Sequence, residues 1–188
     1  MRKFLHRVIC DLVEPETKVL DVGCGKGELL ELLIREKKVR ATGLEINDSA
    51  VYECVAKGLS VYHGDVEEGL LDYAENFFDF VIMDETIQEL RKPEFSIDES
   101  LRVGKKLIIT LPNFAYYKIR FQIFFKGKLP ITKELPYEWY NTPNLRIITI
   151  KDFREFCRKK NIKILKEIFV TDKKYIKIFP NFFAAYGV

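Results

Sequence analysis

Residues 19–33 read VLDVGCGKGELLELL, a short apolar run that passes through three glycines into a leucine-rich segment of helical period. The apolar run predicts a buried strand that ends near Asp21, and the leucines predict a helix that begins after the glycines. Gly23, Gly25 and Gly27 allow tight turns and the close approach of a ligand to the backbone. Because the N-terminus of the helix adds a partial positive charge, this segment predicts a ligand-binding turn.

Three kinds of glycine loop compete for this segment. A Walker loop requires GxxxxGK followed by Ser or Thr, whereas here Gly27 follows Lys26. A dinucleotide fingerprint, GxGxxG, would place its third glycine at position 28, where Glu28 stands. The pattern DxGxGxG resembles instead the cofactor loop of class I methyltransferases, which use S-adenosylmethionine. A purely structural turn is the remaining alternative.

The alternation of strand and helix continues along the chain. Apolar runs predict strands at residues 18–22, 40–44, 59–63, 79–83 and 105–111. Segments of helical period precede or separate them at residues 2–13, 28–35, 47–56 and 96–103. This order predicts the α/β class, with a doubly wound, mostly parallel sheet covered by helices on both faces.

The end of the chain follows another pattern. Residues 151–160 predict a helix, and the runs at 163–170 and 175–179 suit an antiparallel hairpin at the sheet edge. Residues 113–146 fit no strand–helix unit and are predicted to form an aromatic insertion after the fifth strand. Because no repeat or linker divides the chain, residues 1–188 are expected to form a single domain.

Composition and charge exclude several classes of protein. With 47% hydrophobic and 31% charged residues, the chain is neither disordered nor of low complexity. No run approaches the roughly 18 apolar residues of a membrane span, and the N-terminus lacks a signal-peptide core, so a cytoplasmic location is expected. The four cysteines form no CxxC pair, which predicts buried, reduced thiols and no metal site.

Charge is segregated along the sequence. Residues 41–100 sum to −12 and residues 113–160 sum to +7. A basic block rich in aromatics suits a nucleic-acid surface, but an excess of this size is more typical of a solvated face. Nucleic acid is therefore not expected as a partner, and an RNA methyltransferase is kept as the second alternative.

Acidic residues follow the second and third predicted strands. Glu45 comes 24 residues after Asp21, where a carboxylate can accept the two hydroxyls of a ribose, and Asp65 stands where it would face an adenine amino group. One such carboxylate is usually a solvated turn residue, but three at the ends of successive strands predict a cofactor site. The predicted cofactor-binding residues are Asp21, Gly23, Cys24, Gly25, Gly27, Glu45, Ile46, Asp65, Val66 and Asp84.

Asp84 and Glu85 end the fourth predicted strand and are the candidates for a catalytic role. A carboxylate there would hold the ammonium of the cofactor or take a proton from an acceptor, and capping of the next turn is the alternative. His6 and His63 have no paired nucleophile or ligand spacing, and both are expected to be structural.

Residues 17–160 resemble the MetW family of methionine biosynthesis proteins. The resemblance lies in TKVLDVGCGKGELLELL, GLEI, GDVEEGL, FDFVIMDETIQELRKPE, KKLIITLPNF, LPITKELPYEWYNTPN and TIKDF. It implies S-adenosylmethionine as cofactor, and the methyltransferase resemblance implies seven strands in the order 3-2-1-4-5-7-6. The end of the fourth strand, at Asp84 and Glu85, is more acidic than the family pattern.

The resemblance leaves two functions open. In the first, the protein transfers a methyl group from S-adenosylmethionine to an unidentified small acceptor. In the second, it is a non-catalytic, cofactor-binding partner that assists homoserine O-acetyltransferase. The aromatic residues Tyr116, Tyr117, Tyr137, Trp139 and Tyr140 are expected to form an acceptor lid, to pack the insertion against the sheet, or to bury an interface. The partner in such an interface would be the acetyltransferase or a second copy in a homodimer.

Overall fold

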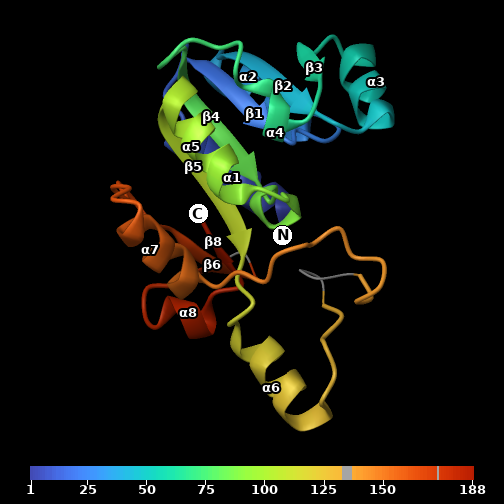
Figure 1. Cartoon of the computed structure of the whole chain (residues 1–188), viewed down its shortest axis with the longest axis vertical. Helices are drawn as coiled ribbons and strands as arrows, with labels where there is room; N and C mark the ends of the chain where they lie inside the picture. The colour runs from blue at the N-terminus through green and yellow to red at the C-terminus, as the bar shows by residue number, and fades with distance from the viewer. Residues whose placement is uncertain (133–136, 173) are drawn as a thin grey trace. The chain divides into compact units, whose positions relative to one another are not determined.

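The computed structural model describes residues 1–132, 137–172 and 174–188 (Figure 1). The chain divides into two compact units, residues 1–109 and residues 110–188. The strand order is β3-β2-β1-β4-β5-β8-β6-β7, and β5 (Gly104–Pro112) begins in the first unit and ends in the second. The expectation of a single domain over residues 1–188 stays a prediction.

The first unit contains a parallel sheet (Figure 1). Its further strands are β1 (Lys18–Val22), β2 (Arg40–Glu45), β3 (Val61–His63) and β4 (Phe78–Asp84). Asp21 of β1 pairs in register with Gly43 of β2 and with Ile82 of β4. The carboxyl ends of β1, β2 and β4 therefore meet at one edge of the sheet.

Helices precede and separate these strands, as predicted except for the two short ones at residues 66–69 and 87–89, which the periodicity missed. They are α1 (Arg2–Leu12), α2 (Glu28–Lys37), α3 (Asp48–Ala56), α4 (Val66–Gly69), the short 3-10 helix η1 (Ile87–Glu89) and α5 (Pro93–Val103). Helix α1 packs against α2, and α5 packs against β4. Because Asn47 caps α3 and Asp65 caps α4 through their side chains, each of these helices begins directly after a strand end.

The core of the first unit lies on the strands β1 and β4. Val22, Val81 and Met83 have no exposed surface, and Leu20 is nearly as buried. Side chains from α4 and the residues after it, Val66 and Leu70 among them, close the same cluster. Strands buried on both faces read as continuous apolar runs, which explains why the sequence predicted them well.

The second unit is built from short elements. They are α6 (Tyr117–Lys126), α7 (Ile150–Lys159), β6 (Phe169–Thr171), β7 (Lys174–Tyr175), α8 (Pro180–Phe183) and β8 (Tyr186–Gly187). Strand β8 pairs antiparallel with both β5 and β6, and β7 pairs antiparallel with β6. A buried Asn113 side chain donates to the carbonyl oxygens of Ala184 (2.8 Å) and Asn181 (3.2 Å), so it ties the end of β5 to α8.

The second unit corrects two details of the predicted sheet. The described residues contain eight strands rather than seven, because β8 was not predicted. It is β8, and not the predicted strand at 175–179, that lies between β5 and β6; the predicted hairpin is present but shortened to β6 and β7. A strand extends only as far as a neighbouring strand pairs with its backbone, and β8 pairs with β6 at two positions.

The aromatic insertion predicted at residues 113–146 contains α6, which carries the helical stripe of Tyr117, Phe121 and Phe124. Residues 133–136 of this insertion lie outside the described residues. None of the helices in the described parts of the chain combines the length and the apolar content that crossing a bilayer requires.

Candidate functional site

The glycine loop joins β1 to α2. Gly23, Gly25 and Gly27 all have positive φ angles, of 74°, 53° and 77°, a backbone region that favours glycine. A β-carbon added to Gly23 would stand 2.7 Å from Oγ1 of Thr86, which follows β4. The close approach of loop and strand end therefore requires glycine at this position.

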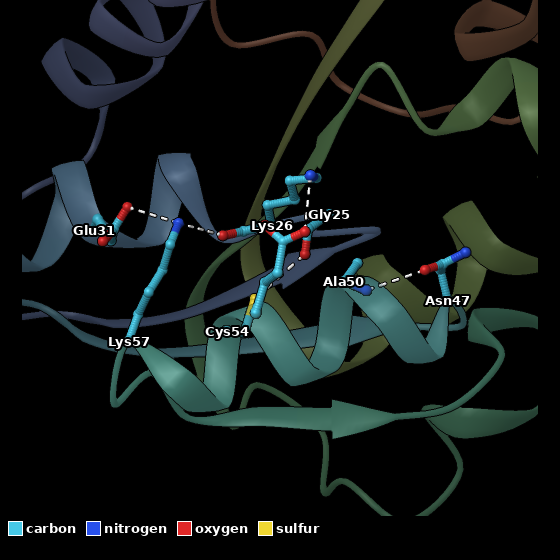
Figure 2. Close-up of polar contacts among 8 residues, drawn as sticks. Gly25, Lys26, Glu31, Asn47, Ala50, Cys54 and Lys57 are labelled. Atoms are coloured by element: carbon cyan, nitrogen blue, oxygen red, sulfur yellow. Dashed lines mark hydrogen bonds and ion pairs between the residues drawn. The ribbon is translucent and has the colours of Figure 1, made fainter.

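The helix α3 anchors the loop from below, as Figure 2 shows. The Cys54 thiol donates to the carbonyl oxygen of Gly25 at 3.3 Å. Lys57 donates to the carbonyl oxygen of Lys26 at 2.8 Å and pairs with Glu31 of α2 at 3.1 Å. These bonds fix the loop backbone before any ligand arrives.

Two cysteine thiols, Cys24 and Cys54, are buried beneath the loop. Burial raises the pKa of Cys24 and, to a smaller extent, of Cys54, because the charged thiolate is poorly solvated there. Thiols held in the protonated form are poor nucleophiles and metal ligands. Cys24 therefore contributes shape to the loop and not chemistry.

Glu45 at the end of β2 is bound to the loop. Its Oε2 accepts from the backbone N–H of Gly25 at 2.8 Å, and its Oε1 accepts from those of Ile46 (2.9 Å) and Asn47 (2.8 Å). A carboxylate has about four acceptor sites, so three donors leave capacity for a hydroxyl. The hydroxyls of a vicinal diol can donate hydrogen bonds to this carboxylate, either beside the Gly25 N–H or in its place.

Asp65 lies at the next strand end. It is the N-cap of α4, and its Oδ1 accepts from the backbone N–H of Glu67 at 2.9 Å. The Gly64 N–H donates to the carbonyl oxygen of Glu45 at 2.9 Å, which ties this turn to the end of β2. Val66 behind the cap is buried and packs in the core cluster of the first unit.

Asp21 is the most unusual residue of the site. Its side chain is buried, with 1% of the residue exposed, and its Oδ1 has no hydrogen-bond partner. Burial holds the pKa of Asp21 well above its usual range, and the negative charge of Asp84 raises it further. Arg2 on α1 acts in the opposite direction. A buried acceptor without a partner is costly, so this atom is suited to receive a donor from a ligand.

Asp84 at the end of β4 is held by a histidine. Its Oδ2 lies 3.0 Å from Nε2 of His6, and both side chains are at most 6% exposed. Asp84 is buried near Asp21, and its charge raises the pKa of Asp21. The contact with His6 comes from α1, a helix far away in the sequence.

The turn after β4 brings further polar groups to the same place. Thr86 donates through Oγ1 to the carbonyl oxygens of Val22 (2.8 Å) and Asp84 (3.2 Å), which locks the end of β4 to the end of β1. Glu85 has a positive φ of 54°, a strained conformation for a residue with a side chain. Such strain is typical of functional turns.

Gln88 and Glu89 complete the cluster. Gln88 is buried and donates to the carbonyl oxygen of Glu85, while its own Oε1 lacks a partner. Burial raises the pKa of Glu89, with the charge of Glu45 as the second cause. Among the described residues three buried side-chain atoms lack partners, and those of Asp21 and Gln88 lie at the ends of β1 and β4. The site thus presents acceptors to a ligand that carries donors.

The structure brings most of the predicted site residues to one sheet edge. The glycine loop follows β1, and Glu45 and Ile46 lie at the end of β2. Asp65 and Val66 follow β3, and Asp84 is the last residue of β4. These acceptors fit the donors of S-adenosylmethionine, namely a ribose diol, an adenine amino group and an ammonium. The role of each residue in binding stays a prediction.

Sequence reasoning overlooked the contribution of α1. His6 was expected to be structural, and Arg2 was not considered, because no local motif links either to residues 80 positions away. One signal was available: His6 is a polar residue on a face that also carries Leu5 and Ile9. A polar side chain on the buried face of an amphipathic helix needs a partner, and here the partner is Asp84.

Comparison with known proteins identifies the family. The family model described as methionine biosynthesis protein MetW matches residues 3–188. The chain is 32% identical over 170 residues to the bifunctional methionine biosynthesis protein MetXA/MetW of Rhodopirellula baltica. This match covers 86% of the chain but only 27% of that relative, so the chain spans about a quarter of the relative's length.

Solved structures show the same fold. A SAM-dependent methyltransferase from Archaeoglobus fulgidus matches with a TM-score of 0.70 at 18% identity, covering 91% of this chain and 73% of that one. A SAM-dependent methyltransferase from Thermotoga maritima matches with a TM-score of 0.68 at 18% identity, covering 98% and 86%. The predicted doubly wound α/β class is thereby confirmed, and the chain belongs to the MetW family of methionine biosynthesis proteins.

Proposed function

We propose that the protein binds S-adenosylmethionine at the carboxyl ends of β1, β2, β3 and β4 and transfers its methyl group to a small acceptor. One observation carries the proposal: the buried Asp21 has an acceptor oxygen without a partner, at the strand ends where open α/β sheets bind ligands. Family membership and the fold of the similar structures support it.

Each carboxylate has a distinct role in this proposal. Glu45 accepts the ribose hydroxyls, in part replacing its bond from Gly25, and Asp65 accepts the adenine amino group. Asp21 accepts the ammonium of the amino-acid end, which supplies the donor that its Oδ1 lacks. The remaining loop residues approach the ligand through the backbone and through small side chains; they are Gly23, Cys24, Gly25, Gly27, Ile46 and Val66.

The cofactor supplies a methyl group already activated by a sulfonium, so the protein's task is alignment of the reacting groups and exclusion of water. Asp84 is engaged by His6, which favours a role in holding the positive charge of the ligand over one in proton transfer. Glu85 is the other acidic side chain at this strand end, on a strained turn locked by Thr86.

Isothermal titration calorimetry tests the binding step. We expect one-to-one binding of S-adenosylmethionine and of S-adenosylhomocysteine, and no competition from NADH, because Glu28 stands in place of the third glycine of a dinucleotide loop. Incubation with methyl-labelled cofactor and a metabolite extract then tests transfer. If neither adenosyl ligand released or absorbed heat at millimolar concentration, the proposed binding of the cofactor would be wrong.

A second candidate function has an observation of its own. The relative from Rhodopirellula baltica carries MetXA and MetW in one chain, and proteins joined in one chain often act together. In this alternative the protein binds the nucleotide and assists homoserine O-acetyltransferase without transferring a methyl group. The exposed aromatic residues Trp139 and Tyr140 are the contact that we propose for such a partner.

Reconstitution separates the two functions. The purified chain is mixed with the homoserine O-acetyltransferase of the same organism, and complex formation and acetyl transfer are measured with and without S-adenosylmethionine. Faster acetyl transfer in the complex, without label transfer to any metabolite, supports the assisting role. Label transfer with no complex supports the methyltransferase.

A further inference from the structure

We propose that His6 on α1 is a positioning residue for the part of the site that receives the amino-acid end of the ligand. This inference rests on the proposed binding of an adenosyl cofactor and extends it to a residue outside the predicted site. The observation behind it is the buried contact of 3.0 Å between Nε2 of His6 and Oδ2 of Asp84, next to the unpartnered Asp21.

Packing alone does not explain a histidine at this position. Helix α1 buries Leu5, Val8 and Ile9, and His6 lies among them with 4% of its surface exposed. An apolar side chain would fill this place without the desolvation of an imidazole and a carboxylate. Buried polar pairs of this kind are often no more stabilising than apolar residues of similar volume. A role in the site accounts for the pair better than stability does.

The charges at the site show what His6 does. The strand ends gather Asp21, Asp84, Glu45 and Glu89, and the charge of Asp84 disfavours ionisation of Asp21. Opposing this repulsion, α1 brings Arg2 and His6 to the cluster. Because His6 contacts Oδ2 of Asp84 and Arg2 favours the charged form of Asp21, α1 helps to hold these two carboxyl groups together at the place where an ammonium would bind.

This arrangement makes a selective prediction about ligands. S-adenosylhomocysteine carries the ammonium and carboxylate of an amino acid, whereas 5′-methylthioadenosine has the same adenosine and a thioether without them. Glu45 and Asp65 serve the adenosine that both ligands share. Asp21, Asp84 and His6 serve only the amino-acid end, so a defect at His6 should affect one ligand and spare the other.

The experiment measures dissociation constants for both ligands by calorimetry on the full chain. We expect His6→Leu to weaken S-adenosylhomocysteine at least tenfold and to change 5′-methylthioadenosine less than twofold. His6→Gln places an amide donor near the position of Nε2 and should stay within about threefold of the wild type for both. The matched control is His63→Leu, the other histidine, which is exposed and should leave the ratio of the two constants unchanged.

A second variant protects the test against misfolding of His6→Leu. Asp84→Asn keeps the side-chain shape and removes the carboxylate that His6 contacts and that we propose to hold the positive charge of the ligand, so it should weaken S-adenosylhomocysteine more than 5′-methylthioadenosine. Equal weakening of both ligands, or unchanged binding of both, would overturn the role of His6 while the proposed function stands. A wild-type chain that binds neither ligand would overturn the proposed function and this inference together.

Discussion

The two units of the chain differ in net charge and in the side chains that they offer to a ligand or partner. Residues 1–109 hold 15 basic and 22 acidic side chains, a net charge of −7, and they bury carboxyl and amide oxygens without partners at the strand ends. Residues 110–188 hold 16 basic and 6 acidic side chains, a net charge of +10. Their exposed aromatic side chains are Phe121, Phe124, Phe125, Tyr137, Trp139, Tyr140, Tyr175, Phe179 and Phe183.

This difference indicates two kinds of partner. Buried acceptors without donors are satisfied by a small polar ligand that enters the sheet edge. Exposed aromatic rings are buried when the surface of another protein covers them, and large aromatics commonly anchor protein interfaces. Helix α6 illustrates the second case, because Ile119 is its one buried residue while Phe124 is 81% exposed. The first unit is thus suited to bind the cofactor and the second to bind a macromolecule.

The largest effect is expected from Gly23→Ala in the first unit. The positive φ alone should destabilise the fold by about 1–2 kcal/mol, and the contact with the hydrogen-bonded Thr86 should add about 1–3 kcal/mol. At about 2–4 °C per kcal/mol, thermal unfolding should show a loss of roughly 4–20 °C.

Gly58→Ala is the matched control for this variant. Gly58 has nearly the same φ, 73°, but a β-carbon there meets nothing within 4 Å. Only the backbone strain of about 1–2 kcal/mol should remain, and ligand binding should persist. Equal losses for the two variants would show that Thr86 does not confine the loop.

The next largest effect is expected from Glu45→Ala. We expect ligand affinity to fall by about 1.5–3 kcal/mol, or roughly 10- to 150-fold, as for the loss of a charge-assisted hydrogen bond. Since Glu45 also accepts from Gly25, Ile46 and Asn47, the unfolding temperature should fall as well. Calorimetry and thermal unfolding measure the two effects, with Glu14→Ala as an exposed control.

Glu45→Gln sharpens this prediction. The amide keeps one acceptor for the backbone donors, so most of the stability should return while ribose binding stays impaired. A well-folded Glu45→Ala variant with an unchanged dissociation constant would show that Glu45 serves only the turn.

An effect of similar size is expected in the second unit from Trp139→Ala. Trp139 is 74% exposed and touches Tyr140 edge-on at 5.6 Å between ring centroids, so the ring is not part of the core. Truncation of an interface anchor commonly costs about 2 kcal/mol, or roughly 30-fold in affinity for the acetyltransferase. Adenosyl binding should be unchanged.

Tyr52→Ala is the control for this surface, because Tyr52 is an equally exposed aromatic residue of the first unit. Co-purification with the acetyltransferase should tolerate its loss. If Trp139→Ala retains the partner and loses cofactor affinity instead, the aromatic block is a lid.

The smallest effect is expected from Asp21→Asn without ligand. Burial raises the pKa of Asp21, so the folded protein favours the protonated carboxyl and loses stability as the pH rises from about 4 through the raised pKa. Asparagine has no charge to bury. The variant should therefore match the wild type near pH 4 and unfold a few degrees higher at pH 8, while it loses ligand affinity.

Asp79→Asn should show the opposite sign. Lys105 and the backbone N–H of Lys18 lower the pKa of Asp79, so its contribution is present above about pH 4 and is lost as the pH falls through the lowered value. This variant should unfold slightly below the wild type at pH 8 and match it in acid. Parallel pH profiles for both variants would contradict the assignment of Asp21.

The first unit was largely predictable from the sequence and the second was not. Strands β1 and β4 are buried on both faces, so their apolar runs stand out, and the glycines mark the loop between β1 and α2. Strand β8 has only two residues, Tyr186 and Gly187, too few for any periodicity, and its place beside β5 depends on pairing across the second unit.

The candidate site was predictable where a motif carried it. Asp21 and Glu45 lie at the ends of β1 and β2, and Asp65 lies just after β3, which the apolar runs of the sequence indicate. The contact of His6 with Asp84 joins residues 78 positions apart, and no local pattern encodes such a distance. The burial of Asp21, which gives the site its unsatisfied acceptor, likewise depends on packing and not on sequence spacing.

Hydrogen–deuterium exchange of the full chain with and without saturating S-adenosylhomocysteine tests most directly whether the ligand belongs to the first unit. Our expectation is slower exchange in the peptides that contain residues 21–27, 45–47, 65–67 and 84–89, and unchanged exchange over residues 110–188. Protection confined to residues 110–188, or no protection anywhere, would contradict it.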